Sequence, residues 1–136
     1  MTAPFADTFY WIALADFTDS AHQLALTLTA ERPNSQFVTT DEVLTEYLNF
    51  FSSSPAPSRR QAAAVVEDLL TSSAVRVIPQ SRGSFRSGLQ LYGERLDKGY
   101  SLTDCISMRT MRREGLTEVL TNDRHFEQEG FRALFR

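Results

Sequence analysis

Short runs of β-branched and aromatic residues alternate along the chain with longer segments in which apolar residues recur every three or four positions. The short runs are typical of strands, and the longer segments are typical of helices with one buried face. The expected strands are APFA (3–6), QFVTT (36–40), VRVIP (75–79), EVLT (118–121) and GFRALF (130–135). The expected helices cover about 19–31, 41–52, 58–72, 81–98 and 102–114.

Strands separated by helices indicate an α/β fold, with a mainly parallel sheet that helices cover on both faces. The nearest thing to a linker is SSSPAPS (52–58), and a chain of 136 residues has the size of one compact domain. We therefore predict a single domain over residues 1–136. In open sheets of this kind, ligands bind outside the carboxyl ends of the strands.

Composition and motifs restrict the cellular setting. With 42% hydrophobic residues, the chain is expected to bury roughly two thirds of the surface that its unfolded form exposes. The apolar run FYWIALA (9–15) ends at Asp16, far short of the roughly 20 residues that cross a bilayer. The single cysteine, Cys105, has no partner for an internal disulfide, and no cleavable leader opens the chain. These features predict a soluble cytoplasmic protein without a membrane partner.

Four acidic residues lie where the predicted fold brings distant segments to one edge of the sheet. Asp7 follows the first strand, Glu46 lies one turn into the helix after QFVTT, Asp104 starts a later helix, and Asp123 comes two residues after EVLT. All four side chains are therefore able to meet at the carboxyl ends of the strands. Such clustered carboxylates repel one another unless a cation offsets their charge.

Two of these acids have alternative explanations that the residues leave open. Ser101 and Asp104 form the sequence of a capping box, in which the serine caps the helix and the acid binds back to the cap backbone. Asp123 follows Asn122, and both residue types favour tight turns. Each acid therefore has a structural role that needs no ligand.

The acids of the helix at 41–52 differ in their positions on its surface. Val43, Leu44, Tyr47, Leu48 and Phe51 form the expected buried stripe. Glu42 lies nearly opposite this stripe and is expected to be solvated, whereas Glu46 lies nearer the edge of the stripe. Asp41 is explained by the helix dipole in the first turn. Asp7 opens a hydrophobic segment, where a charge is costly without a partner.

Other reactive residues carry weaker signals. His22 and His125 have no His or Cys at zinc-ligand spacing, so a surface or packing role is expected. Cys105 has no evident base and suits a small buried position. The chain also lacks both GxGxxG and GxxxxGK, which excludes the common glycine-rich nucleotide loops.

The net charge of −3 lacks the basic excess that is usual for a nucleic-acid binder. If four of the 17 acids hold a metal, however, 13 acids stand against 14 basic residues elsewhere. The arginines are also grouped, at Arg59 and Arg60, at Arg82 and Arg86, and at Arg109, Arg112 and Arg113. Net charge therefore decides little about an RNA partner.

The acids are embedded in ADTFYWIAL (6–14), VTTDEVLTEYL (38–48), YSLTDCIS (100–107) and VLTNDRHF (119–126). In order, spacing and surroundings, these four segments resemble the PIN-domain family, especially the VapC-like ribonuclease toxins. The resemblance extends over nearly the whole chain. It implies a three-layer α/β/α sandwich with a mainly parallel central sheet.

The resemblance also implies an activity and a site. Asp7, Glu46, Asp104 and Asp123 correspond to the acidic tetrad of the family, which makes them the expected catalytic and metal-ligating residues. Oxygen ligands without His or Cys select Mg²⁺ or Mn²⁺ over zinc. The implied protein is a metal-dependent endoribonuclease, the toxin of a type II toxin–antitoxin pair, with a small antitoxin as partner. Cleavage is expected to leave a 5′-phosphate and a 3′-hydroxyl.

One departure from the family pattern concerns the first motif, where many relatives carry Ser or Asn two positions after the aspartate and this chain has Phe9. This departure leaves open a catalytically weak RNA-binding or interaction domain. Two other functions also stay open: an RNA-processing nuclease outside a toxin–antitoxin system, and a DNA-directed nuclease of the same broad fold. A homodimer is also expected, from the resemblance and from apolar residues in FYWIALADF and LNFF.

Overall fold

Five parallel strands form one sheet in the computed structural model, which describes residues 3–136. They are β1 (Phe5–Ala6), β2 (Phe37–Thr40), β3 (Val75–Ile78), β4 (Glu118–Leu120) and β5 (Arg132–Ala133), in the spatial order β3-β2-β1-β4-β5. All five coincide with expected strands. The first strand is brief, and its short pairing register joins Phe5 to Val38 of β2 and to Val119 of β4.

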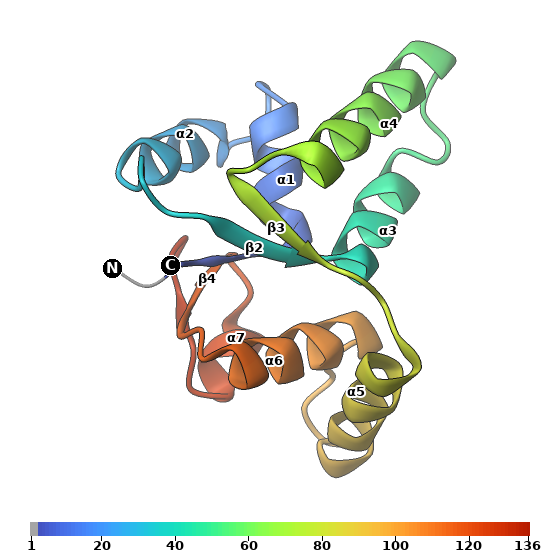
Figure 1. Cartoon of the computed structure of the whole chain (residues 1–136), viewed down its shortest axis with the longest axis vertical. Coiled ribbons are helices and arrows are strands. Elements are labelled where there is room, and N and C mark those ends of the chain that lie inside the picture. The colour runs from blue at the N-terminus through green and yellow to red at the C-terminus, as the bar shows by residue number, and fades with distance from the viewer. Residues whose placement is uncertain (1–2) are drawn as a thin grey trace.

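Helices cover both faces of this sheet (Figure 1). On one face lie α1 (Thr8–Ala15), α2 (His22–Ala30), α3 (Asp41–Phe50) and α4 (Ala56–Thr71); on the other lie α5 (Arg82–Glu94), α6 (Leu102–Glu114) and α7 (Arg124–Gln128). Phe5 and Val119 are fully buried between the two layers, as are Tyr47 from α3 and Met108 from α6. The predicted three-layer α/β/α sandwich is therefore confirmed.

Helix α1 was not expected, because its sequence is an apolar run rather than an amphipathic pattern. Tyr10, Trp11 and Ala13 are all buried, so α1 hides more than one face and loses the helical period that identifies a surface helix. FYWIALADF therefore supplies the core rather than an exposed patch, and only Phe17 beyond the helix is 81% exposed. Across residues 3–136, no helix has the length and apolar character to cross a bilayer.

Helices α5 and α6 pack extensively against each other in the second layer, and this packing depends on Gly88. A Cβ atom at Gly88 would lie 2.3 Å from Cγ1 and 3.1 Å from Cα of Ile106. Only a residue without a side chain therefore allows this approach of the two helices. Helix α5 ends at Glu94, earlier than the expected limit of 98, and the chain turns through Gly99 at φ +74°.

The strand order creates a crevice at the carboxyl ends of β1 and β4. The chain leaves β1 through α1 and α2 on one face, whereas it reaches β4 through α5 and α6 on the other face. Loops from neighbouring strands therefore diverge at this point, which is where open α/β sheets bind their ligands.

Candidate functional site

An open cavity of about 460 Å³ lies at this crevice, and all four acids selected from the sequence line it. It is hereafter the acid cleft, and its lining residues are Asp7, Thr8, Phe9, Glu46, Ser101, Asp104, Thr121, Asn122 and Asp123. The loops after β1 and β4 contribute residues, as do α3 and the start of α6. The fold thus gathers segments from both ends of the chain at one place.

Asp7 is the most buried of the four acids, with 7% of its surface exposed. It is the N-cap residue of α1, but its side chain does not make the usual capping bond. Instead, the hydroxyl of Thr121 donates a hydrogen bond of 2.8 Å to Oδ2 of Asp7. This bond links the loops that follow β1 and β4 and fixes the orientation of the carboxylate.

Burial raises the pKa of Asp7 from 3.8 to about 7. The hydrogen bond from Thr121 acts in the opposite direction, while the charges of Asp104 and Glu46 raise the pKa further. A carboxylate in this setting is stabilised in its ionised form by a nearby cation.

Asp104 is the N3 residue of α6 and makes both bonds of the expected capping box. Its backbone N–H donates to Oγ of Ser101 at 3.0 Å, and its Oδ2 accepts from the backbone N–H of Ser101 at 3.1 Å. Burial raises the pKa of Asp104, and the charges of Asp123 and Glu46 raise it further. The capping role therefore coexists with a position inside the acid cleft, because a carboxylate oxygen has a second lone pair.

Glu46 and Glu42 lie one helical turn apart on α3, and they face different surroundings. The hydroxyl of Thr8 donates a hydrogen bond to Oε1 of Glu46, which directs this carboxylate into the acid cleft. Glu42 was expected to be solvated, but the hydroxyl of Ser84 donates to its Oε2 at 2.9 Å. Asp41 also has a partner, since its Oδ2 accepts from the backbone N–H of Gln80 at 2.9 Å. These contacts join α3 to the segment that leads into α5.

Asp123 occupies the N-cap position of α7, in agreement with its expected preference for a turn. Its Oδ1 accepts a hydrogen bond of 2.9 Å from the backbone N–H of His125. The backbone N–H of Asp123 donates to the Thr121 hydroxyl at 3.2 Å. Thr121 therefore contacts both Asp7 and Asp123 and sets their relative position.

His125 was expected to have a surface or packing role, and the structure places it beside the acids. Its ring packs against Tyr100 with 5.2 Å between ring centroids. Its Nδ1 lies 3.3 Å from Oδ1 of Asp123 and 3.8 Å from Oδ2 of Asp104. These three side chains offer ligand atoms within 4.8 Å of one another. The sequence does place His125 two residues after Asp123. Because no second His or Cys lies at zinc-ligand spacing, this nearness did not predict a metal ligand.

A model of the PIN domain family matches residues 5–131, which is nearly the whole chain. The chain belongs to the PIN domain family. The resemblance described from the sequence is thus confirmed. A comparison with curated proteins found no significant match.

Two solved structures resemble this PIN domain along almost their full length. The crystal structure of VapC20 from Mycobacterium tuberculosis, a toxin that cleaves the sarcin–ricin loop, is 25% identical with a TM-score of 0.84. The comparison covers 95% of this chain and 96% of VapC20. FitAcB from Neisseria gonorrhoeae is 14% identical with a TM-score of 0.69, covering 95% and 94% of the two chains, and shows the shared fold.

Phe9, the departure from the family pattern, forms part of the wall of the acid cleft in this PIN domain. Its ring packs edge-on against Phe135, with 5.0 Å between the ring centroids. Thr8, the neighbouring residue, supplies the hydroxyl that contacts Glu46. Although position 9 has no polar side chain, Thr8 thus provides a hydroxyl at the start of α1, one position before Phe9.

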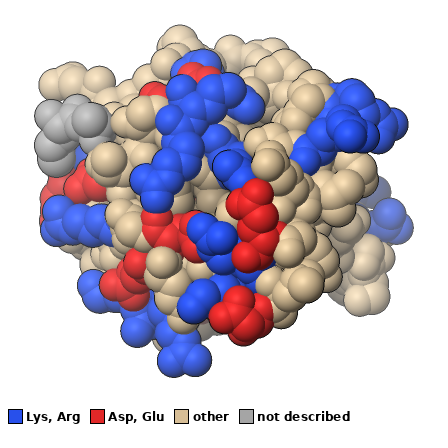
Figure 2. Space-filling view, turned by 90° about the horizontal axis from the view of Figure 1, so that it is seen from below, with Lys and Arg blue, Asp and Glu red and all other residues tan. Residues whose placement is uncertain are grey.

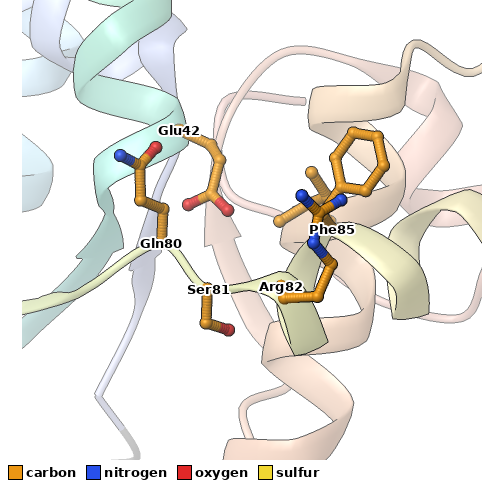
Figure 3. A pocket seen from close by; sticks show the side chains of 6 residues that line it. Glu42, Gln80, Ser81, Arg82 and Phe85 are labelled. Carbon is orange, nitrogen blue, oxygen red and sulfur yellow. The ribbon is translucent and has the colours of Figure 1, made fainter.

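A second cavity, of about 570 Å³, is lined by residues of α3, α5 and α6 and of the segment that leads into α5, so it shares α3 and α6 with the acid cleft. It is hereafter the Arg82 pocket, lined by Glu42, Gln80, Ser81, Arg82, Phe85 and Ile106. Figure 3 shows Glu42 on one side of this pocket and Arg82 with Phe85 on the other. The guanidinium carbon of Arg82 lies 5.5 Å from the centre of the Phe85 ring. A positive charge and a 41% exposed aromatic ring thus lie together.

Proposed function

We propose that this protein is a Mg²⁺- or Mn²⁺-dependent endoribonuclease and the toxin of a type II toxin–antitoxin pair. The proposed metal ligands and catalytic residues are Asp7, Glu46, Asp104 and Asp123. The observation that carries the proposal is the convergence of these four carboxylates on one cleft, with Asp7 buried at its base. The VapC likeness supports the toxin assignment.

The donor set fits a hard divalent ion. Carboxylate oxygens dominate the acid cleft, and the raised pKa values of Asp7 and Asp104 indicate that their ionised forms lack sufficient compensation from the protein alone. A bound divalent ion supplies positive charge to polarise the scissile phosphate and to lower the pKa of a water molecule.

The residues of this chain orient the carboxylates before any substrate arrives. Thr121 holds Asp7, Thr8 holds Glu46, and the start of α6 holds Asp104. Such fixed geometry reduces the reorganisation that the reaction would otherwise require. By resemblance to the family, the attacking water cleaves the RNA strand so that the phosphate stays on the 5′ end of the downstream product.

RNA binding needs basic or aromatic side chains that contact phosphates and bases, and none of the described residues that line the acid cleft is basic. On the face formed by α5, α6 and α7, basic and acidic side chains are interspersed, as Figure 2 shows, and Arg95 and Arg109 are paired with Glu129 and Glu94. The Arg82 pocket is better suited, because an exposed aromatic ring stacks with bases and an arginine contacts phosphates. We assign the RNA strand next to the scissile bond to this pocket.

Incubation of labelled RNA with the purified protein tests the activity. Cleavage is expected with Mn²⁺ or Mg²⁺ and is expected to stop with EDTA. RNA binding without cleavage would instead favour a catalytically weak PIN-fold binding domain, the alternative that Phe9 in the cleft wall keeps open. Preferential cleavage of DNA in a mixed-substrate assay would contradict the RNA assignment.

The proposed partners are a small antitoxin and a second copy of the chain. Leu89, Tyr92 and Leu96 follow one another at spacings of three and four residues along α5 and just beyond it, and they are 47%, 45% and 80% exposed. An apolar stripe of this kind is typical of a surface that another chain covers. Light scattering should therefore give twice the 15.4 kDa mass of the monomer. An adjacent reading frame for a small DNA-binding protein would distinguish a toxin from an RNA-processing nuclease.

A further inference from the structure

We infer that His125 is a nitrogen ligand of the divalent ion in the acid cleft, and that it makes this site selective for Mn²⁺ over Mg²⁺. The inference rests on the metal part of the proposed function. It adds a fifth residue, of different chemistry, to the four carboxylates.

The environment of Nδ1 is the first observation. This nitrogen is buried, and it makes no hydrogen bond among residues 3–136. Its nearest carboxylate oxygen, Oδ1 of Asp123, lies 3.3 Å away. Ordinary N–H···O bonds are about 2.7 to 3.2 Å long. An ordinary hydrogen bond therefore does not account for the position of the imidazole.

The spacing of the ligand atoms is the second observation. In an octahedral site with bonds of about 2.1 Å, neighbouring ligand atoms are about 3 Å apart. The distances from Nδ1 to Oδ1 of Asp123 and Oδ2 of Asp104 are 3.3 and 3.8 Å. Small movements of the side chains are enough to bring all three atoms into contact with one ion.

An aromatic contact also restricts the ring of His125. Tyr100 is buried and packs against the His125 ring, and its hydroxyl donates a hydrogen bond of 2.9 Å to Oε2 of Glu129. Arg95 donates to the same oxygen at 2.9 Å. The fully buried Phe126 fixes the adjacent backbone. The imidazole therefore has few alternative orientations.

A nitrogen ligand changes the preference of the site. Mg²⁺ prefers oxygen ligands, whereas binding to a mixed nitrogen and oxygen site rises along the first transition series. Among the two ions proposed for this cleft, Mn²⁺ gains more from an imidazole. The expected metal is thus Mn²⁺ when both ions are present at equal concentration.

Electron spin-echo spectroscopy of the Mn²⁺-loaded protein tests the inference, because a coordinated imidazole nitrogen modulates the Mn²⁺ echo. The wild-type protein should show nitrogen modulation, His125→Gln should lose it, and His22→Gln, the control on α2, should retain it. Mn²⁺ affinity should fall about tenfold in His125→Gln, with a smaller fall for Mg²⁺ measured by competition. Circular dichroism checks the fold of both variants.

The wild-type spectrum is decisive even if a variant fails to fold. Bound Mn²⁺ without nitrogen modulation in the wild type would overturn the inference, as would modulation that persists in His125→Gln. RNA cleavage without nitrogen modulation would support the proposed function and contradict only the assignment of His125 as a ligand. Nitrogen modulation without RNA cleavage would support the His125 ligand and remove the ribonuclease assignment. Failure to bind Mn²⁺ would overturn both.

Discussion

Helices α3 and α6 line both the acid cleft and the Arg82 pocket, but the two cavities differ in charge. The acid cleft gathers four carboxylates, two of which have a raised pKa, whereas the Arg82 pocket places a guanidinium beside an exposed ring. The carboxylates of the acid cleft repel an RNA phosphate unless a cation offsets their charge, and the Arg82 pocket, which also contains Glu42, is the proposed contact for the RNA strand. The comparison teaches that the net charge of the whole chain is a poor guide here, because the proposed RNA contact and the proposed chemistry belong to different cavities.

The largest expected effect comes from removing charge in the acid cleft. Asp7→Asn, Asp104→Asn or Asp123→Asn should lower the rate of Mg²⁺-dependent RNA cleavage by more than about 100-fold, since even changes behind metal ligands cost 10- to 100-fold. The fold should persist, because the volume of the side chain hardly changes. Initial rates on labelled RNA measure the effect, with the exposed Glu67→Gln of α4 as the control. A variant that cleaves at the wild-type rate would not be an essential ligand.

The second effect concerns the pH dependence of stability without metal. The folded protein holds a proton on Asp7 up to about pH 7, whereas the unfolded chain releases it near the ordinary pKa of 3.8. Stability in EDTA should therefore fall as the pH rises between these values, by on the order of 4 kcal/mol from this group. The loss should be complete above the folded-state pKa.

Urea unfolding of the wild type and of Asp7→Asn, at about pH 5 and about pH 8, measures this contribution. The stability of the variant should depend less on pH than that of the wild type. Equal pH dependence in the two proteins would show that Asp7 is not the titrating group.

A smaller effect is expected in the Arg82 pocket. Phe85→Ala should raise the KM for RNA about tenfold and leave kcat nearly unchanged, because one stacked base contributes roughly 1 to 3 kcal/mol. Leu70→Ala on α4 removes an apolar side chain of similar exposure and is the control. A fall in kcat with an unchanged KM would place the ring in the reaction rather than in RNA binding.

The smallest expected effect separates the two roles of Asp104. Weakening of the capping bond should cost Asp104→Asn about 0.5 to 1 kcal/mol without metal, because an amide oxygen accepts from the Ser101 N–H less strongly than a carboxylate does. If Asp104 is also a ligand, the variant should lose much of the rise in melting temperature that Mg²⁺ gives the wild type. Relief of repulsion among the other carboxylates should offset part of the capping loss. Equal Mg²⁺-induced shifts in thermal melts would argue against the ligand role.

The parts of the fold that the sequence predicts are those with local signals. The β-prone run QFVTT becomes β2, and the capping pair Ser101 and Asp104 marks the start of α6, whose bounds agree with the expected 102–114. The family resemblance then predicts which acids meet. Helix α1 was missed because burial on several sides removes the amphipathic period.

Contacts that depend on the packing of separate elements left no local signal. Ser84 lies 42 residues after Glu42 in the chain, and its hydroxyl reaches Glu42 only in the fold, where α6 packs against both α3 and α5. His125 approaches Asp104 only after β4 and α6 are in place. Sequence patterns identify faces and ends of elements, whereas these contacts depend on how the elements meet in three dimensions.

The close packing of α5 and α6 at Gly88 fixes the position of the Arg82 pocket relative to the acid cleft. Arg82 and Phe85 are carried by α5, whereas Asp104 is carried by α6, so the contact of Gly88 with Ile106 sets the distance from the proposed RNA-contacting groups to the proposed metal ligand. A single methyl group at this position would clash with Ile106 and push α5, with Arg82 and Phe85, away from α6. Under the proposed RNA path, the absence of a side chain at this helix crossing determines which phosphodiester bond lies beside the four carboxylates.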